Sequence, residues 1–366
     1  MSNSGNISRR HALKLAGAGL AGTAALATPA IASDASKVIR WKMVTSWPKN
    51  LPGPGVSAQR ICDRIKTMSN GRLEVDLYSA GELVPAFEVF DAVAGGAAQM
   101  GHSAAFYWQG KVPASVFFTT VPYGLTPNEH STWIEFGGGQ ELWDELYAPF
   151  NLKPFMGGNT AGTMAGWFKD PVTKLDDLQG LKIRIQGLGG EIMRRAGATP
   201  VTMPTSEMYS AMQSGVVDAI EFLGPASDGA LGLQKIAKHY YGPGANKPNG
   251  TGEATVNLEE YNALPADLQM IVAEACRSEH AQALAEATWH NAVALANLQS
   301  KYDVQVLGFP ADVTAELKRL SAVVMDEFVE EHEGTQKVFE SYNKAKGTVS
   351  QWSDLSIRDY LIARDS

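Results

Sequence analysis

The sequence predicts an α/β fold of two lobes, with a mixed, mainly parallel sheet in each lobe and long C-terminal helices. Segments in which apolar side chains recur at every second residue, as in strands, alternate with helical segments over the first two thirds of the chain, which favours parallel sheets. From Pro265 onward the pattern is helical, with one long element to about Ser300. The 366-residue chain is also longer than one compact core usually requires, which favours two lobes.

The first segments predict a β-α-β unit. Ile39, Trp41 and Met43 alternate with basic residues, as expected of a strand with one buried face. Residues 56–69 form an amphipathic helical pattern, and alternation resumes at 73–77. A strand, a helix and a second strand in this order indicate a parallel pair joined by a crossover helix.

Further short strands are expected at 117–120, at 153–157 and from Leu181, too many for one small lobe. We therefore predict lobe I at 33–125, with later segments returning near 220–260, and lobe II at 126–220 with later helical segments. The first crossing between lobes is expected near Thr120–Asn128 or shortly beyond. Residues 265–366 are expected to bridge the lobes and to form the C-terminal helices. The Gly- and Pro-rich run at 242–250 is expected to be a loop.

The stretch 181–228 predicts a cleft for a small anion. Apolar residues alternate with polar ones in 181–186, so Arg184 lies near the exit of a strand, on its polar side. Glycines at 187–190 end this strand and open a helix, and 201–203 supplies the next strand. A second helix, capped at Thr205 or Ser206, leads to a strand at 217–222. In open α/β sheets, ligands bind beyond the carboxyl ends of such strands.

The N-terminus resembles an export signal. Residues 1–32 hold the pair Arg9 and Arg10, a modest apolar run, and an Ala-x-Ala site that predicts cleavage after Ala32. The apolar run is shorter than the roughly 18 to 20 residues of a membrane span. We predict a twin-arginine signal and a periplasmic protein. Ala12 replaces a large apolar residue common in such signals, so the general secretory route stays open.

Composition excludes several classes of function. The formal net charge is −8, and removal of residues 1–32 makes it about −11, which argues against nucleic-acid binding. The chain shows no nucleophile with a base, no metal-ligand spacing and no complete phosphate loop, since Ile192 stands at the third glycine of a dinucleotide pattern. We therefore predict a protein that is not an enzyme. Cys62 and Cys276 are expected to be buried free thiols, with a disulfide left open.

Several long motifs, in order, resemble the DctP-type binding proteins of tripartite ATP-independent periplasmic (TRAP) transporters, in particular the α-keto acid-binding branch. The resemblance covers nearly all of the chain after the signal. It implies a two-lobed periplasmic receptor that closes by hinge motion on an organic monocarboxylate and delivers it to a membrane permease. A 2-oxo or 2-hydroxy acid is favoured. The matching segments are VTSWPKNLPGPG from Val44, SAGELVPAFEVFDAVAGGAAQMGH from Ser79, VPASVFFTTVPYGLT from Val112, GGGQELWDELYAPFNLKPF from Gly137 and GGNTAGTMAGWF from Gly157.

Arg184 is the leading candidate for the carboxylate contact, since its planar fork can hold a carboxylate through two charge-assisted hydrogen bonds. Taken alone, a strand-end arginine is more often part of a surface ion pair. The resemblance places the family's carboxylate-binding arginine in this strand. It also implies that Asn159 contacts the ligand and that Trp47, Phe106 and Tyr107 wall the pocket. Otherwise Asn159 is a turn-forming residue and the aromatic residues are core packing.

The resemblance also implies a bridging cation, Na⁺ or Ca²⁺, between an acid and the ligand. Glu221 and the carbonyl of Phe222 are expected to hold it, with Glu253 as a third ligand. The alternative for Glu221 is an ordinary salt bridge to a lysine or arginine. Thr163 stands where the branch usually has glutamine, and Phe222 where it has tryptophan. Both are smaller, which predicts a roomier cavity around Thr163 and Phe222.

Three alternative functions would each require features that differ from those of the favoured one. A C4-dicarboxylate or an aromatic carboxylate would need a second cation in the pocket, and the sequence offers no obvious one near the motif residues. A secreted enzyme would need catalytic groups that the sequence lacks. A purely structural role would leave Arg184 in a permanent salt bridge. The C-terminal helices are also a candidate homodimer contact.

Overall fold

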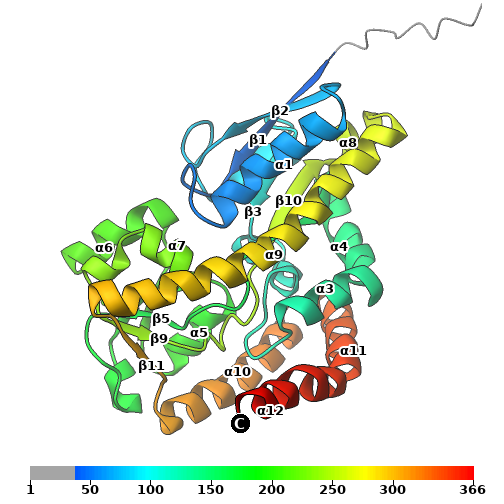
Figure 1. Cartoon of the computed structure of the whole chain (residues 1–366). Coiled ribbons are helices and arrows are strands. Elements are labelled where there is room, and N and C mark those ends of the chain that lie inside the picture. The colour runs from blue at the N-terminus through cyan, green and yellow to red at the C-terminus, as the bar shows by residue number, and fades with distance from the viewer. Residues whose placement is uncertain (1–37) are drawn as a thin grey trace, which may run out of the picture. The chain divides into compact units, whose positions relative to one another are not determined.

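The computed structural model describes residues 38–366, so the predicted export signal lies outside the described residues. The first of two sheets has the order β2-β1-β3-β10-β4 (Figure 1). β1 pairs in parallel with β2 and β3, whereas β10 is antiparallel to β3 and β4. The bounds are β1 (Ile39–Thr45), β2 (Leu73–Tyr78), β3 (Met100–Ser103), β10 (Thr251–Asn257) and β4 (Leu152–Asn159).

The second sheet has the order β11-β9-β5-β8-β6-β7. β5 is antiparallel to β8 and β9, and the other pairs are parallel. The predicted fold class, two mixed α/β lobes with long C-terminal helices, is confirmed. The bounds are β11 (Gln305–Leu307), β9 (His239–Tyr241), β5 (Gly166–Phe168), β8 (Ala219–Ile220), β6 (Lys182–Arg184) and β7 (Thr199–Val201).

Helix α9 (Ala266–Tyr302) joins the two sheets. Its 37 residues span about 55 Å at 1.5 Å per residue. It packs on β4 and α1 (Pro54–Met68) of the first lobe and on α7 (Pro225–Ala230) of the second, and Figure 1 shows it running along both. The prediction of a long bridging helix from 265 to about 300 therefore agrees with the structure.

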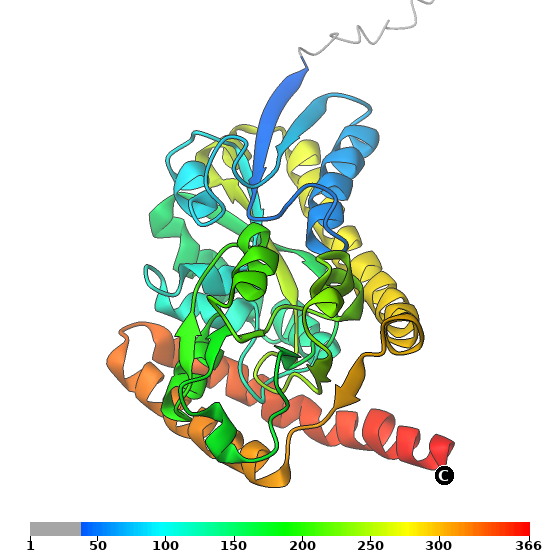
Figure 2. The same cartoon turned by 90° about the vertical axis from the view of Figure 1, so that its left-hand side faces the viewer.

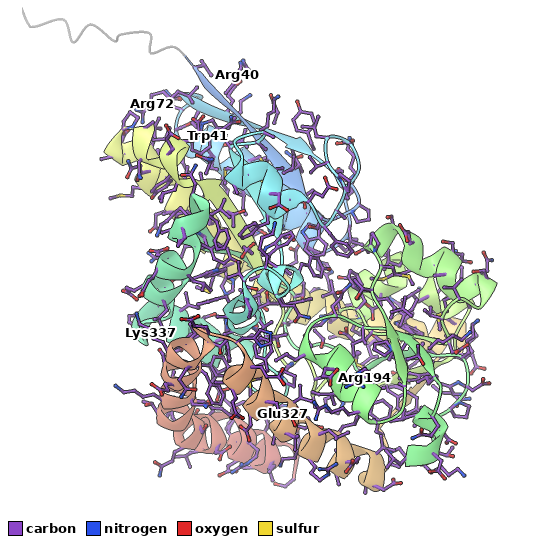
Figure 3. The ribbon with its side chains drawn as sticks, turned by 180° about the vertical axis from the view of Figure 1, so that it is seen from behind. Arg40, Trp41, Arg72, Arg194, Glu327 and Lys337 are labelled. Atoms are coloured by element: carbon purple, nitrogen blue, oxygen red, sulfur yellow. The ribbon has the colours of Figure 1, made fainter. Side chains whose placement is uncertain are left out.

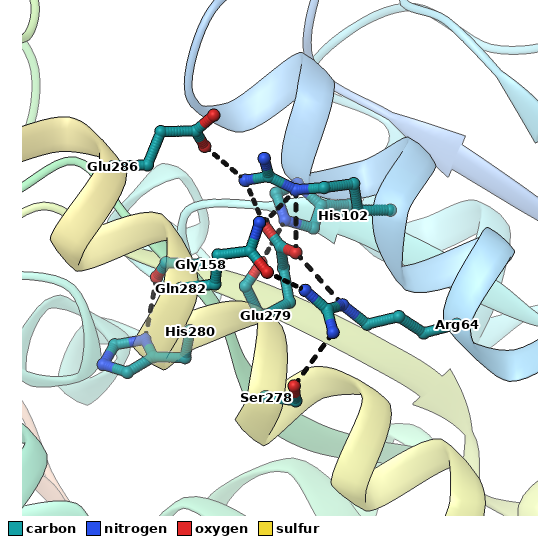
Figure 4. A network of polar contacts seen from close by, with 10 residues as sticks. Arg64, His102, Gly158, Ser278, Glu279, His280, Gln282 and Glu286 are labelled. Atoms are coloured by element: carbon teal, nitrogen blue, oxygen red, sulfur yellow. Dashed lines mark hydrogen bonds and ion pairs between the residues drawn. The ribbon is translucent and has the colours of Figure 1, made fainter. Parts of the chain in front are cut away.

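A buried carboxylate fixes α9 to the first lobe. Both oxygens of Glu279 accept from Arg60 on α1, with Nε at 2.9 Å and Nη2 at 2.7 Å, and Arg64 lies 3.4 Å away (Figure 4). One residue later, Nδ1 of His280 lies 2.9 Å from the carbonyl of Gly158. These contacts hold the middle of α9 against the end of β4.

Helices near the C-terminus pack against both lobes. α5 packs on α10, where Arg195 forms an ion pair with Glu327, and Lys337 on α11 lies 2.5 Å from Glu145 on α4. Figure 3 shows Glu327 and Lys337 on these C-terminal helices. Figure 2 shows α10 to α12 along one side of the molecule. The remaining bounds are α2 (Val89–Ala94), α3 (Pro127–Phe136), α4 (Gly139–Tyr147), α5 (Leu188–Arg195), α6 (Met208–Ser214), α8 (Leu258–Ala263), α10 (Ala311–Glu331), α11 (Thr335–Ser353) and α12 (Tyr360–Asp365), with a π-helical turn at Asp354–Asp359.

Cys62 and Cys276 are buried, free, and members of one apolar cluster between α1, α9 and the first sheet. Burial raises the pKa of both thiols, that of Cys276 to about 12, which favours the protonated form of each. The prediction of two buried free thiols is confirmed. No helix of residues 38–366 is both long enough and apolar enough to cross a bilayer.

Two local predictions differ from the structure. The segment 117–120 forms no strand, because its first two residues end a 3-10 helix, η2 (Pro113–Phe118), and the next two follow that helix. Phe118 stacks between Trp133 and Trp143, with ring centroids 5.3 and 4.8 Å apart, so its burial satisfies the apolar pattern without sheet pairing. The first passage between sheets lies between β4 and β5, later than 120–128, because α3 and α4 return the chain to the first sheet.

Candidate ligand-binding site

A cavity lies between the two sheets, where strand ends and loops from both lobes meet. The first lobe contributes aromatic and small polar residues, and the second contributes two cations and Phe222. This is the place that the strand order 181–228 predicted for a ligand. Its lining residues include Trp47, Ser57, His102, Ser103, Phe106, Tyr107, Thr119, Asn159, Arg184, Phe222, Lys247 and Thr251.

Arg184 ends β6 and is only 1% exposed. Nη1 donates to the carbonyl of Glu221 at 2.9 Å, while Nε and Nη2 both reach the carbonyl of Met203 at a long 3.4 Å. Within residues 38–366, no carboxylate lies within ion-pair distance of this guanidinium. A buried arginine without an acidic partner is costly, since a buried charge requires compensation. The salt bridge expected of a structural role is therefore not present in the described part of the chain.

Lys247 supplies a second buried cation, 6% exposed, from the loop between β9 and β10. Its Nζ lies 2.5 Å from Oε1 of Glu221 and also donates to the carbonyl of Phe222. Burial lowers the pKa of Lys247, and the charge of Glu221 opposes that shift. Glu221 thus forms a salt bridge to a lysine, which was the predicted alternative to cation binding.

Glu221 itself is 1% exposed. Although its Oε1 is in ion-pair contact with Lys247, neither oxygen receives a hydrogen bond of good geometry from the described residues. The ion pair is the dominant interaction, because the attraction between charges 2.5 Å apart depends on distance and not on hydrogen-bond angle. Oε2 retains full capacity to accept a further donor.

Two predicted residues do not line the cavity. Thr163 lies behind the loop 242–250, where its hydroxyl donates to the carbonyl of Lys247 at 2.5 Å, so its small size does not enlarge the cavity. The carboxylate of Glu253, on β10, accepts from Trp108 Nε1 at 2.8 Å and from the Tyr147 hydroxyl at 2.6 Å. Burial raises the pKa of Glu253 to about 7. Because Trp108 and Tyr147 donate to its two oxygens, the carboxylate of Glu253 is engaged within the first lobe.

Asn159 lines the cavity, but its side-chain amide is engaged by the protein. Nδ2 donates to Oδ1 of Asn249 at 2.9 Å and to Oγ1 of Thr251 at 3.2 Å, and Oδ1 accepts from the backbone of Ala161 at 2.8 Å. The last bond forms an Asx turn that supports Ala161 at a φ of 62°. The turn-forming interpretation of Asn159 thus has direct geometric support.

Aromatic side chains form the wall opposite the cations. Trp47, Phe106 and Tyr107 all line the cavity, and the Trp47 and Tyr107 rings lie 5.8 Å apart. The indole of Trp47 donates to Nδ1 of His102 at 2.8 Å, and Nε2 of His102 lies 2.8 Å from the carbonyl of Gly157. Burial lowers the pKa of His102 to about 4, so this histidine is neutral and orients Trp47.

Sequence reasoning missed Lys247 and His102 as lining residues. The run 242–250 was recognised only as a loop, and a single lysine among Gly, Pro and Asn residues shows no periodicity that indicates burial. His102 lies near the carboxyl end of β3, and that position is the one signal that could have identified it.

The profile of the family described as bacterial extracellular solute-binding protein, family 7 (DctP), matches residues 45–332. The chain belongs to this family. It is 35% identical over 322 residues to the monocarboxylate 2-oxoacid-binding periplasmic protein of Nostoc sp. strain PCC 7120, covering 88% of each chain. These matches confirm the predicted resemblance to TRAP solute-binding proteins.

Two similar solved structures contain a metal ion together with a small acid. A TRAP solute-binding protein of Pseudoalteromonas atlantica has sodium and pyruvate bound (36% identity, TM-score 0.86, 89% of this chain and 99% of that chain). One of Bordetella bronchiseptica, a mixed-occupancy dimer, has calcium and picolinate bound at its active site (31% identity, TM-score 0.86, 89% and 98%). In these two relatives, sodium or calcium thus accompanies the acid, as expected of the predicted bridging cation.

The arrangement in this chain differs from a ready metal site. The carboxylate of Glu221 and the carbonyl of Phe222, the two predicted ligands, are in contact with the ammonium of Lys247. Glu253 and Thr163 are engaged elsewhere. In residues 38–366, no three His, Cys, Asp or Glu side chains are grouped to hold a metal ion. As they stand, these residues do not fit a metal.

Proposed function

We propose that this chain is the periplasmic substrate-binding subunit of a TRAP transporter, which captures a 2-oxo or 2-hydroxy monocarboxylate by hinge closure and delivers it to a membrane permease. The observation that carries this proposal is Arg184, buried at the wall of the cavity without an acidic partner among the described residues. A ligand carboxylate supplies the missing counter-charge and uses the planar fork.

The charges of the cavity favour a monoanion. Arg184 and Lys247 are cationic and Glu221 is anionic, so one positive charge is left for the ligand. Asp228 lies outside the cavity lining and accepts hydrogen bonds from Trp167 and Tyr240. A C4-dicarboxylate would bring one anionic charge too many.

The size of the cavity favours a compact acid. The cavity is small, with a volume of about 30 Å³. A ligand with few non-hydrogen atoms, such as pyruvate, suits this space better than a large aromatic acid. The Nostoc and Pseudoalteromonas relatives, named for 2-oxoacid and pyruvate binding, support the same class.

A thermal-shift panel followed by calorimetry tests the ligand class. We expect pyruvate and lactate to stabilise the protein, with one site per chain. Propionate, which lacks the 2-oxygen, and succinate, which carries a second carboxylate, are the matched comparisons and should bind more weakly. Strong binding of succinate alone would replace the monocarboxylate proposal by the dicarboxylate one.

Hinge closure is proposed from the chain connections. Only 160–165, the loop 242–250 and α9 lead between the sheet strands that flank the cavity, so a few backbone torsions can open it. Small-angle scattering should show a smaller radius of gyration after pyruvate is added. An unchanged radius with saturating pyruvate would contradict closure.

We also propose export through the twin-arginine route. Replacing Arg9 and Arg10 with lysine should trap the precursor in the cytoplasm, and unchanged export would assign the general secretory route instead. The periplasmic family supports the destination.

A homodimer is proposed through the C-terminal helices. Trp352, Leu355, Tyr360 and Ile362 expose 59 to 69% of their surface there, an apolar group unusual for an isolated surface. The Bordetella relative is a dimer. Light scattering of the mature chain should give twice the monomer mass, and a Trp352→Glu variant should be monomeric.

A further inference from the structure

The ammonium of Lys247 has an unused donor at the cavity. An ammonium carries three N–H donors. One donates to the carbonyl of Phe222, and the ammonium forms an ion pair with the carboxylate of Glu221 that lacks good hydrogen-bond geometry. Even if this ion pair occupies a second N–H, the described residues offer no acceptor for the third. Since Lys247 lines the cavity, that donor is available to a ligand there.

The backbone around Lys247 is held firmly. The hydroxyl of Thr163 donates to the carbonyl of Lys247, and the carbonyl of Thr163 accepts from Gly244 at 2.9 Å. A Cβ on Gly244 would lie 2.5 Å from Oγ1 of Thr163, so only glycine allows this close approach. The loop therefore fixes the lysine at both the backbone and the ammonium.

The two cations of the cavity are anchored to consecutive carbonyl groups. Arg184 donates to the carbonyl of Glu221, and Lys247 donates to the carbonyl of Phe222. Burial is the main cause of the lowered pKa of Lys247, and the positive charge of Arg184 acts in the same direction, as expected of two cations at one cavity. An anion that contacts both relieves their repulsion.

We propose that Lys247 is the second ligand-binding cation of this receptor, and that its ammonium contacts the 2-oxygen or the carboxylate of the bound acid in place of a metal ion. This inference rests on the proposed function and specifies how the same cavity holds its ligand. Arg184 takes the carboxylate through its fork, and Lys247 takes the remaining oxygen from the side of Glu221. The acid then binds without added sodium or calcium.

The contacts of Glu221 support this assignment over a metal. The ammonium already neutralises that carboxylate and uses the Phe222 carbonyl, so a metal ion at these oxygens would first have to displace it. The freed ammonium would then lie buried without its anion, which is unfavourable. The relatives with sodium or calcium therefore differ from this chain in how the ligand's oxygen is held.

The first experiment uses the wild-type mature protein and pyruvate. Calorimetry is run in sodium-free buffer with chelator, and again with sodium or calcium added. We expect the dissociation constants to agree within about twofold, and elemental analysis of the complex to find no stoichiometric calcium or sodium. Binding that disappears in the metal-free buffer and returns with either ion would overturn the inference.

The second experiment uses Lys247→Ala. Loss of one charge-assisted hydrogen bond should weaken pyruvate binding in metal-free buffer by roughly 10- to 100-fold. Calcium should restore part of the affinity, because the Glu221 carboxylate and the Phe222 carbonyl become free for it. Lys235→Ala, an exposed lysine in the same lobe, is the matched control and should bind as the wild type does. Wild-type affinity of Lys247→Ala without metal would contradict the proposal.

A double variant guards against misfolding, since Lys247→Ala leaves Glu221 buried and unpaired. Lys247→Met with Glu221→Gln removes both charges at nearly constant volume. It should bind pyruvate weakly in both buffers and show no response to calcium. Full affinity of the double variant would also overturn the proposal. If no carboxylate binds the wild type in any buffer, the proposed function fails, whereas metal-dependent binding refutes only the role of Lys247.

Discussion

Replacing Arg184 with alanine should abolish most ligand affinity while leaving the fold intact. Of the five N–H donors of its guanidinium, three have backbone acceptors, two of these at a long 3.4 Å. The other two have no carboxylate or backbone acceptor among the described residues, although the Tyr107 hydroxyl lies within reach of the guanidinium. Two hydrogen bonds from a charged group to a carboxylate are worth about 3 to 6 kcal/mol. Leaving one buried charge of a pair without its partner costs about 3 to 5 kcal/mol, which agrees with the energy of the two hydrogen bonds.

We therefore expect pyruvate affinity to fall by about 3 to 5 kcal/mol, or roughly a hundredfold to several thousandfold. Arg184→Lys keeps the charge but loses the fork, so its affinity should be intermediate. The ligand-free stability should change little, because the acidic partner of the cavity, Glu221, is held by Lys247 rather than by Arg184.

Titration calorimetry measures the loss directly, and circular dichroism melting checks the fold. Arg40→Ala is the matched control, because Arg40 lies exposed at the far end of β1 in an ion pair with Glu74 (Figure 3). It should bind pyruvate as the wild type does. Near wild-type affinity of a folded Arg184→Ala variant would refute the assignment of the carboxylate contact.

Three further predictions concern other buried polar groups. Burial raises the pKa of Glu253 to about 7, so the stability of the wild type is highest below about pH 4.5 and falls as the pH rises through 7. In urea titrations at pH 8, Glu253→Gln should therefore have a free energy of unfolding up to about 3 kcal/mol above that of the wild type. At pH 4.5 it should show no gain, and its pyruvate affinity should be unchanged. Glu279→Ala leaves Arg60 without its bidentate partner and should lower the free energy of unfolding by about 2 to 4 kcal/mol in urea titrations, unlike the exposed control Glu330→Ala. Thr163→Val removes the hydroxyl that holds the Lys247 carbonyl and should weaken pyruvate binding about 3- to 10-fold by calorimetry; an unchanged affinity would show that the loop needs no such anchor.

Strong periodicity made the first and last parts of the fold predictable. β1, α1 and β2 follow the alternation from Ile39 and the helical stripe at 56–69, and α9 follows the long pattern to Ser300. The 3-10 helix at 113–118 was not predicted, because a short apolar run fits a buried 3-10 helix as well as a strand. The predicted passage between sheets lies too early in the chain. After α3 and α4 the chain returns to the first sheet as β4, and nothing in the sequence of these helices indicates to which sheet the next strand belongs.

The site was predictable where it lies at strand ends. The alternation placed Arg184 at the exit of β6, and the family resemblance gave it the carboxylate contact. The cavity lies at the carboxyl ends of strands, where ligands of open α/β sheets are expected. Lys247 was not identified, because its burial depends on Glu221, 26 positions earlier, and on a loop whose conformation has no periodic pattern. Tertiary proximity of this kind has no counterpart in local sequence.

A crystal structure of the mature wild-type protein with pyruvate, grown without sodium or calcium, tests the central claim most directly. We predict one pyruvate in the cavity, with its carboxylate on the two free N–H groups of Arg184 at about 2.7 to 2.9 Å and an oxygen within hydrogen-bond distance of Lys247 Nζ. Pyruvate bound elsewhere, or a guanidinium of Arg184 that still contacts only the carbonyls of Glu221 and Met203, would contradict the account.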